Sequence, residues 1–265
     1  MLELGHTLLL GWVGCLVAGF LLWLWSLARQ DVSVVDIAWG MFFVGLTVWF
    51  RSRGPEVQTF HWIHLGLVGA WGLRLALHIA LRARGHGEDP RYAAMRAEHP
   101  AAFQWRSLVT VFALQATLAA ALAVPLLVVQ SATSISPIAL AVGTALWVIG
   151  FACEAFADWQ LQRFRDDPAS RGRVLDSGLW RYSRHPNYFG ESVLWWGYGL
   201  FALGAPGAGS AWALLAPLFM TFLLLRVSGV TLLEKTIVHR RPEYDAYIRR
   251  TSAFVPWPPR KARAA

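Results

Sequence analysis

The 265-residue chain is too apolar for an ordinary soluble protein: hydrophobic residue types make up 56% of it and charged residues 15%, with a mean hydropathy of +0.42. Such a composition is typical of integral membrane proteins. The net charge of +8 would suit a nucleic acid, but the charges lie between and after the apolar segments. We therefore expect the lipid bilayer as partner, with no nucleic acid and no obligate protein partner.

Seven apolar segments are long enough to cross about 30 Å of hydrocarbon as helices, which takes roughly 20 residues each. They leave little sequence for anything else. We therefore predict an all-α fold, a polytopic membrane bundle of about seven transmembrane helices in a single domain, residues 1–265. The predicted spans are 7–28, 34–51, 62–82, 107–130, 137–157, 188–204 and 209–233.

The basic residues are distributed unevenly between the two sides of this bundle. Of the 24 Lys and Arg residues, 20 lie in the segments after the first, third and fifth spans and in the C-terminal tail. Because cytoplasmic loops carry the excess of Lys and Arg, we expect the C-terminus in the cytosol and the N-terminus outside. The same rule accounts for many of the arginines without any ligand.

The second and third spans each contain a charged residue. Asp36 lies inside an apolar run, where an ionised carboxylate is costly without a partner, and Arg74 is one possible partner. A buried structural pair and a role at a substrate explain these two residues equally well.

A polar stripe marks the cytosolic end of the fifth span. Glu154, Asp158 and Gln162 step by four and so share one helix face. Such a stripe needs a bundle interior, a water-filled cavity or a ligand to face. Carboxylates suit ribose hydroxyls or a nicotinamide amide, whereas the arginines further out suit phosphate. The pattern therefore favours a nucleotide cofactor inserted ring first, with its phosphates near Arg165, Arg171 and Arg173.

The segment GLWRYSRHPNYFGESVLWWGY, residues 178–198, is the most informative stretch. Pro186 suits the first turn of a helix, where its missing N–H would have no partner. The free N–H groups and the dipole of that helix start, next to Arg181, Arg184 and His185, make an anion site. Asn187 and Glu191 share one face just inside the membrane, where a carboxylate is a functional hypothesis.

The end of the chain adds two more charged residues and a tail. Arg226 and Glu234 are eight apart and extend the same cavity wall if the helix continues. The tail predicts a short amphipathic helix starting near Pro242, with Trp257 as an interfacial anchor. No Cys/His cluster has the spacing of a metal site, so we expect no metal.

The block GLWRYSRHPNYFGESVLWWGYG, with DVSVVDIAWG near the start and RRPEYDAYIRRTSAFVPWPP at the end, resembles the membrane steroid 5α-reductase superfamily. It is most similar to a bacterial branch that carries this family's C-terminal domain and is mostly of unassigned function. The resemblance is strong over residues 150–258 and weaker before them. It implies a seven-helix protein of the bacterial inner membrane, with NADPH in residues 137–258 and the substrate side in residues 1–130. The implied reaction is hydride transfer to the carbon–carbon double bond of a lipophilic, steroid- or isoprenoid-like enone.

The residue pattern and the resemblance together predict roles for individual residues, and the resemblance itself implies cofactor contacts at Glu154, Asp158, Arg165, Arg173, Asn187, Glu191 and Arg226. The steroid reductases hold the substrate carbonyl with residues that have no clear match here, so only Asp36, Trp39 and Trp71, with Arg74 beside them, are expected near the substrate. Glu191, Asp36 as a proton donor and Tyr198 as a second donor are the catalytic candidates. Glu234 stands where the reductases tend to have a tyrosine. The expected cofactor contacts are Glu154, Asp158, Arg165, Arg171, Arg173, Arg181, Tyr182, Arg184, His185, Asn187, Tyr188, Glu191, Arg226 and Glu234.

Two other functions remain open at this point. The R-H-P-x-Y-x-G motif is shared with isoprenylcysteine carboxyl methyltransferases and phospholipid methyltransferases, where the region resembles a site for S-adenosylmethionine. A methyltransferase of a lipid or prenylated substrate is therefore the alternative, and a non-catalytic lipid-binding membrane protein is a second one. The arginines favour NADPH, because S-adenosylmethionine has no phosphate to neutralise.

Overall fold

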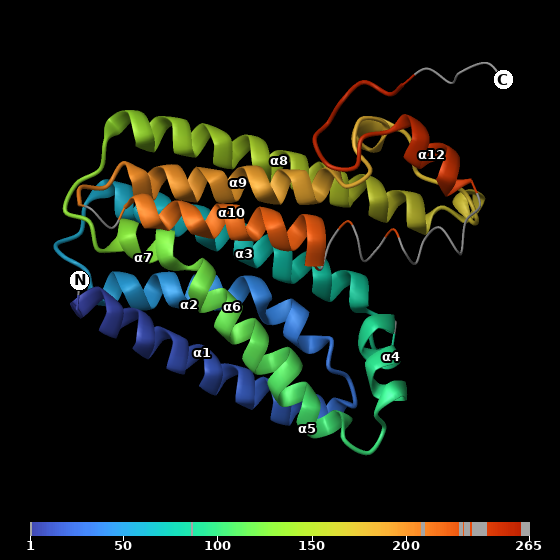
Figure 1. Ribbon diagram of the computed structural model, residues 1–265, viewed down its shortest axis with the longest axis horizontal. Coiled ribbons are helices and arrows are strands. Elements are labelled where there is room, and N and C mark those ends of the chain that lie inside the picture. Colours follow the sequence, from blue (N-terminus) through green and yellow to red (C-terminus); the bar gives the residue numbers. More distant parts are fainter. Residues whose placement is uncertain are drawn as a thin grey trace. The chain divides into compact units, whose positions relative to one another are not determined.

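The computed structural model describes residues 2–85, 87–207, 210–227, 230, 234 and 243–260. These residues form helices and no β-strand, apart from an isolated bridge between Ser183 and Ser252, so the all-α prediction is confirmed. The longer helices in chain order (Figure 1) are α1 (Leu2–Arg29), α2 (Val34–Arg53), α3 (Thr59–Ala83), α4 (Pro90–Glu98), α5 (Phe103–Ser107), α6 (Leu114–Leu122), α7 (Val124–Gln130), α8 (Pro137–Asp166), α9 (Pro186–Leu203), α10 (Leu215–Phe222) and α12 (Tyr244–Arg250). Two π-helical stretches, η1 (Leu108–Ala113) and η5 (Leu223–Val227), adjoin α-helices, and η2 (Pro168–Ser170), η3 (Gly178–Arg181) and η4 (Ala211–Leu214) are short 3₁₀ helices.

The helices have the length and apolarity of a polytopic membrane bundle. Among the described residues, five segments are long and apolar enough to span a bilayer: the greater part of α1, then α2, α3, Phe103–Leu122 and α8. The sixth predicted span corresponds to the 18-residue α9. The described part of the seventh includes the apolar stretch Ala211–Val227, and residues 209, 228–229 and 231–233 of that prediction lie outside the described residues. The orientation of the bundle in the membrane stays a prediction.

Two predicted boundaries are wrong. The fourth span, 107–130, is not one helix: it breaks at Ala123, whose backbone has φ −75° and ψ 1°, between α6 and α7. Pro125 follows two residues later, and a proline lacks the N–H that would continue the helix. The fifth span is longer than predicted, because α8 runs on to Asp166. The whole polar stripe therefore lies on one helix.

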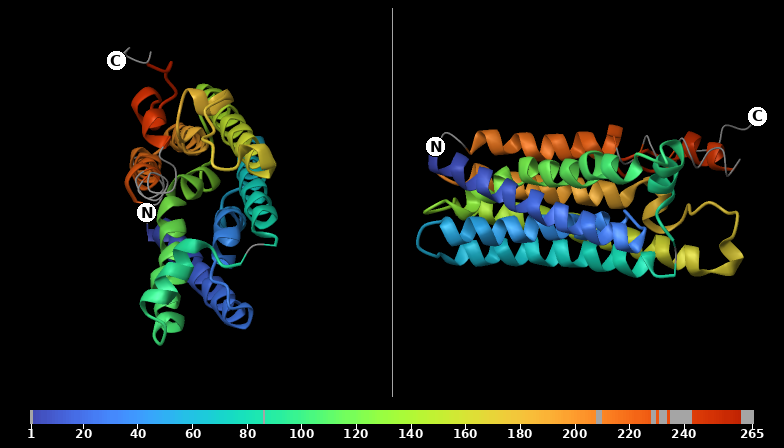
Figure 2. Two further views of the ribbon diagram at one scale, coloured as in Figure 1. Left: turned by 90° about the vertical axis from the view of Figure 1, so that its right-hand side faces the viewer. Right: turned by 90° about the horizontal axis from the view of Figure 1, so that it is seen from below.

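The chain divides into two compact units. Unit 1 consists of residues 1–137 and 201–213, and contains α1 to α7. Its helices α2 and α3 run side by side (Figure 2). They approach closely at Gly40 and Gly72, since a Cβ atom on Gly40 would lie 2.6 Å from the Gly72 carbonyl oxygen.

Unit 2 consists of residues 138–200 and 214–265, and it is built on the pair α8 and α9. A Cβ atom on Gly150 of α8 would lie 2.4 Å from the backbone nitrogen of Leu194. A Cβ atom on Gly190 of α9 would lie 2.5 Å from the backbone nitrogen of Glu154. Small residues let membrane helices approach to backbone contact, so this pair is held at a spacing that only glycine allows.

Candidate functional site

Three buried carboxyl groups belong to the α8–α9 pair of unit 2. Glu154 is 2% exposed, Asp158 7% and Glu191 9%. Asn187 on α9 donates a hydrogen bond from Nδ2 to Oδ1 of Asp158 on α8, at 3.1 Å. Gly190 lies between Asn187 and Glu191 in the sequence of α9, and it packs against the backbone of Glu154 on α8. The predicted polar stripe of α8 and the predicted polar face of α9 therefore lie at the same contact between the two helices.

The start of α9 is held against α8 by the segment that precedes it. The helix begins at Pro186, as predicted. In the preceding turn, the Leu179 N–H donates to Oε1 of Gln160 at 3.0 Å, and the Trp180 indole N–H donates to the Ala157 carbonyl at 3.1 Å. Both acceptors lie on α8, so one helix positions both the turn and the start of α9.

Arg184 was predicted to lie at an anion site, and the structure places it in a buried ion pair. Its side chain donates from Nε and Nη2 to the two carboxylate oxygens of Glu234, at 2.6 and 3.0 Å. Its Nη1 donates to the carbonyl oxygens of Thr251 and Ile248, at 2.6 and 3.2 Å. All three nitrogens of this guanidinium are therefore used within the protein.

Glu234 also lies within hydrogen-bonding distance of the His185 imidazole. His185 Nε2 lies 3.1 Å from Oε1 of Glu234. Burial alone would raise the pKa of Glu234, but the hydrogen bonds from His185 and Arg184, together with their charge, lower this pKa to about 2. Glu234 is therefore ionised at neutral pH.

The remaining predicted cofactor residues of unit 2 differ in exposure. Tyr188 is half-buried and stacks parallel to the His185 ring, with centroids 5.6 Å apart. Tyr198 is fully buried, and its hydroxyl accepts a hydrogen bond from the Trp147 indole at 2.9 Å. The side chains that remain exposed are Arg165, Arg171, Arg173, Arg181, Tyr182 and Arg226.

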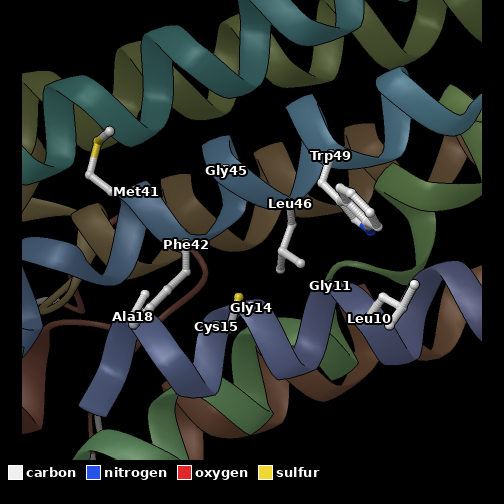
Figure 3. A pocket seen from close by; sticks show the side chains of 10 residues that line it. All are labelled: Leu10, Gly11, Gly14, Cys15, Ala18, Met41, Phe42, Gly45, Leu46 and Trp49. Carbon is white, nitrogen blue, oxygen red and sulfur yellow. The ribbon is translucent and has the colours of Figure 1, made fainter. Parts of the chain in front are cut away.

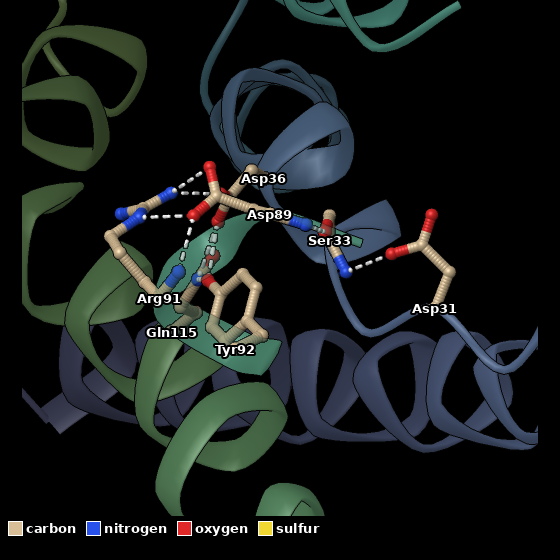
Figure 4. A network of polar contacts seen from close by, with 7 residues as sticks. All are labelled: Asp31, Ser33, Asp36, Asp89, Arg91, Tyr92 and Gln115. Carbon is tan, nitrogen blue, oxygen red and sulfur yellow. Dashed lines mark hydrogen bonds and ion pairs between the residues drawn. The ribbon is translucent and has the colours of Figure 1, made fainter. Parts of the chain in front are cut away.

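Unit 1 contains a second polar cluster, centred on Asp36 (Figure 4). The Asp36 carboxylate accepts hydrogen bonds from Arg91 Nη2 and the Tyr92 hydroxyl, each at 2.7 Å, and from Gln115 Nε2 at 3.1 Å. Gln115 Nε2 also lies 3.3 Å from the Tyr92 oxygen. Burial raises the pKa of Tyr92, and the Asp36 carboxylate raises it further. The phenol therefore keeps its proton, and the carboxylate acts as the acceptor.

Arg91, Tyr92 and Gln115 are not among the predicted site residues. Arg91 and Tyr92 lie on α4, a helix that was not predicted although Asp89-Pro90 is a recognisable helix start: Asp89 caps the backbone N–H of Arg91. Of the other residues expected near the substrate, Trp71 is fully buried against Phe43, and Trp39 and Arg74 are half-buried.

Unit 1 also has an apolar cavity of about 340 Å³ between α1 and α2 (Figure 3). Its lining includes Gly11, Gly14, Cys15, Phe42 and Trp49, and none of the predicted site residues. Within the described ranges, no three His, Cys, Asp or Glu side chains are grouped as a metal site would require.

The long apolar helices make this protein a helical integral membrane protein, and its buried carboxyl groups mark a candidate site within it. Residues 22–251 match the family described as "Protein of unknown function (DUF1295)", and the chain belongs to this family, which is steroid 5α-reductase-like. The resemblance seen in the sequence is thereby confirmed.

Individual relatives cover smaller parts of the chain. It is 35% identical to the 3-oxo-5-alpha-steroid 4-dehydrogenase 1 of Bos taurus over 65 residues, which is 24% of this chain and 25% of the bovine protein. It is 26% identical to the enzyme of the same name from Rattus norvegicus over 118 residues, 43% of this chain and 40% of the rat protein. An uncharacterized Schizosaccharomyces pombe protein is 32% identical over 95 residues, 36% of this chain and 27% of that protein. The matches thus span between a quarter and two fifths of these relatives' lengths. No solved structure matches the chain.

Proposed function

We propose that this protein is an NADPH-dependent reductase of the bacterial inner membrane that acts on a carbon–carbon double bond in a lipophilic, steroid- or isoprenoid-like enone. The observation that carries the proposal is the set of buried carboxyl groups on α8 and α9, joined by the Asn187–Asp158 hydrogen bond. Buried ionisable groups in membrane helices are rare and mark functional sites. The similarity to two 3-oxo-5-alpha-steroid 4-dehydrogenases supports the same reaction class.

The polar groups of unit 2 fit the chemistry of NADPH. Oδ1 of Asn187 is buried and has no hydrogen-bond partner among the described residues, which leaves an acceptor for a carboxamide N–H. Carboxylates such as Glu154, Asp158 and Glu191 match ribose hydroxyls. Exposed arginines at the end of α8 and in the segment between α8 and α9 suit the phosphates: these are Arg165, Arg171, Arg173 and Arg181.

NADPH, when bound, supplies the hydride that adds to the β-carbon of the enone. The chain must then provide a donor for the oxygen on which negative charge develops. Tyr198 on α9 is the candidate for this role, because its hydroxyl accepts the Trp147 indole N–H and keeps its own hydrogen to donate. Asp36 already accepts hydrogen bonds from Arg91, Tyr92 and Gln115, so we do not assign it as the proton donor.

The proposal is tested by measuring reduction of a steroidal enone by the detergent-purified protein with NADPH. We expect turnover by the wild type, and none by Asn187→Ala or Glu191→Ala. Ser192→Ala is the matched control, since Ser192 is buried on the same helix but bonds to Thr221 on α10 at 2.8 Å. Full activity of the Asn187 and Glu191 variants would refute the placement of the cofactor.

One observation favours the second candidate, a methyltransferase that uses S-adenosylmethionine. The buried groups on α8 and α9 are acidic, and the buried Arg184 is already paired with Glu234. A buried acidic site suits the sulfonium cation of S-adenosylmethionine better than a phosphate. Methyl transfer to a lipid acceptor, without any NADPH oxidation, would decide for this candidate. Inactivity with both cofactors would favour a non-catalytic lipid-binding protein.

A further inference from the structure

The C-terminal segment, residues 244–257, is bound to the chain just before α9 by a row of hydrogen bonds. The backbone N–H of Arg184 donates to the Ser252 carbonyl at 2.8 Å, and the N–H of Trp257 donates to the Tyr182 carbonyl at 2.9 Å. The Ser183 hydroxyl donates to the Phe254 carbonyl at 2.7 Å. These bonds resemble those between two short β-strands, and they hold the C-terminal segment along residues 182–184.

The side chain of Arg184 lies at the centre of this contact. It is 7% exposed, and a buried guanidinium is stable only where a counter-charge and acceptors satisfy its N–H groups. Glu234 supplies the counter-charge in a two-point pair, and the carbonyls of Ile248 and Thr251 at the end of α12 accept from Nη1. A cation at the C-terminal end of a helix also complements the helix dipole.

The same carboxylate fixes the state of the His185 ring. An ionised Glu234 can only accept hydrogen bonds, so His185 Nε2, 3.1 Å from its Oε1, must carry the hydrogen. The ring is 3% exposed and stacks parallel to Tyr188. Its orientation is therefore determined from one side by Glu234 and from another by an aromatic face of α9.

We propose that Arg184 and Glu234 form a latch that fastens the C-terminal segment to the start of α9 and positions the His185 ring there. This assigns Arg184 to holding the protein together instead of binding a phosphate. It also gives the C-terminal segment a structural role at the start of α9 in unit 2. The latch acts in the same way whichever cofactor or substrate the protein binds, so it does not rest on the proposed reductase activity.

The test separates the latch from the general effect of leaving a buried charge unpaired. The single variant Arg184→Met leaves the Glu234 carboxylate without its arginine partner. The double variant Arg184→Met with Glu234→Leu removes both charges, and replacing a whole buried pair by apolar residues is often close to neutral for stability. Each purified protein is heated to obtain its melting temperature and exposed to trypsin, with cleavage followed at Arg249 and Arg250. The control Asp176→Asn breaks the exposed Arg250–Asp176 pair of the same tail.

We expect the single variant to melt at a lower temperature and the double variant to recover most of this loss. Cleavage should nevertheless be faster in the double variant than in the wild type, about tenfold or more, because the bonds to Ile248 and Thr251 are gone. The control should be cut at about the wild-type rate. If trypsin cleaves the double variant at the wild-type rate, the proposed latch is refuted.

A spectroscopic measurement tests the positioning of His185. In protein labelled with ¹⁵N-histidine, the wild-type spectrum should show a hydrogen on His185 Nε2, assigned by the loss of this signal in His185→Gln. The double variant should lose this signature. Arg184→Lys, which keeps the charge but offers a single ammonium, should retain the signature and show intermediate cleavage. A His185 signal unchanged in the double variant, or wild-type cleavage of Arg184→Lys, would contradict the proposal.

Discussion

The close approach of α8 and α9 predicts a large effect of one added methyl group. In Gly190→Ala the new Cβ atom would lie 2.5 Å from the Glu154 backbone nitrogen and 2.6 Å from the Gly150 carbonyl oxygen, where ordinary contacts begin at 3.4 Å. Both neighbours are backbone atoms of a helix and cannot rotate away, so the helices must separate by almost 1 Å. Overpacking of this kind costs about 3 kcal/mol, of which the better helix propensity of alanine offsets about 1 kcal/mol.

We therefore expect Gly190→Ala to lower the free energy of unfolding in detergent by about 2 kcal/mol. The control is Gly69→Ala on α3, where a Cβ atom meets nothing within 4 Å. This variant should be neutral or stabilised by up to about 1 kcal/mol. Separation of the helices should also weaken the Asn187–Asp158 hydrogen bond and, with it, cofactor binding. Equal stability of the two variants would refute the close contact, and unaltered cofactor affinity of Gly190→Ala would refute its role at the site.

Two further predictions concern the polar clusters. The pKa of Glu234 is lowered from 4.5 in the unfolded chain to about 2 in the folded protein. Between about pH 2 and pH 4.5 the unfolded chain therefore binds a proton that the folded protein does not bind. The contribution of Glu234 to the free energy of unfolding should be fully present above about pH 4.5 and should be lost as the pH falls toward 2. Unfolding measured across this range should show a weaker pH dependence in Glu234→Gln, and an identical profile would contradict the pairing. Tyr198→Phe should keep NADPH binding intact and lower reductase turnover by about 10²–10⁴-fold. If Tyr198→Phe turns over at the wild-type rate, Tyr198 is not the donor.

The parts of this fold that sequence reasoning predicted are those with a local signal. Hydropathy predicted the long apolar helices but not the polar helix α4, and Pro186 predicted the first residue of α9 correctly. The i, i+4 spacing placed Glu154 and Asp158 on one face, and both are buried. The break before Pro125 was also readable, because a proline inside a helical pattern ends or kinks the helix. It was missed because the apolar run continues through it.

The parts that could not be predicted depend on contacts between residues far apart in the sequence. Asp36 meets Arg91 and Gln115, which are 55 and 79 residues away, and Arg184 meets Glu234 across 50 residues. A single sequence shows which charges need partners in the membrane, but it does not show which partners they find. This is why an arginine beside a helix start was expected to bind an anion, when the carboxylate it binds is the protein's own.

The most direct test of the proposed function is the melting temperature of the purified protein with NADPH, NADH or S-adenosylmethionine added separately. A ligand at about a hundred times its dissociation constant stabilises the folded state by roughly 2.7 kcal/mol. We predict a clear increase with NADPH, reduced in Asn187→Ala and unchanged in Ser192→Ala. An increase with S-adenosylmethionine and none with NADPH would contradict the reductase and identify a methyltransferase.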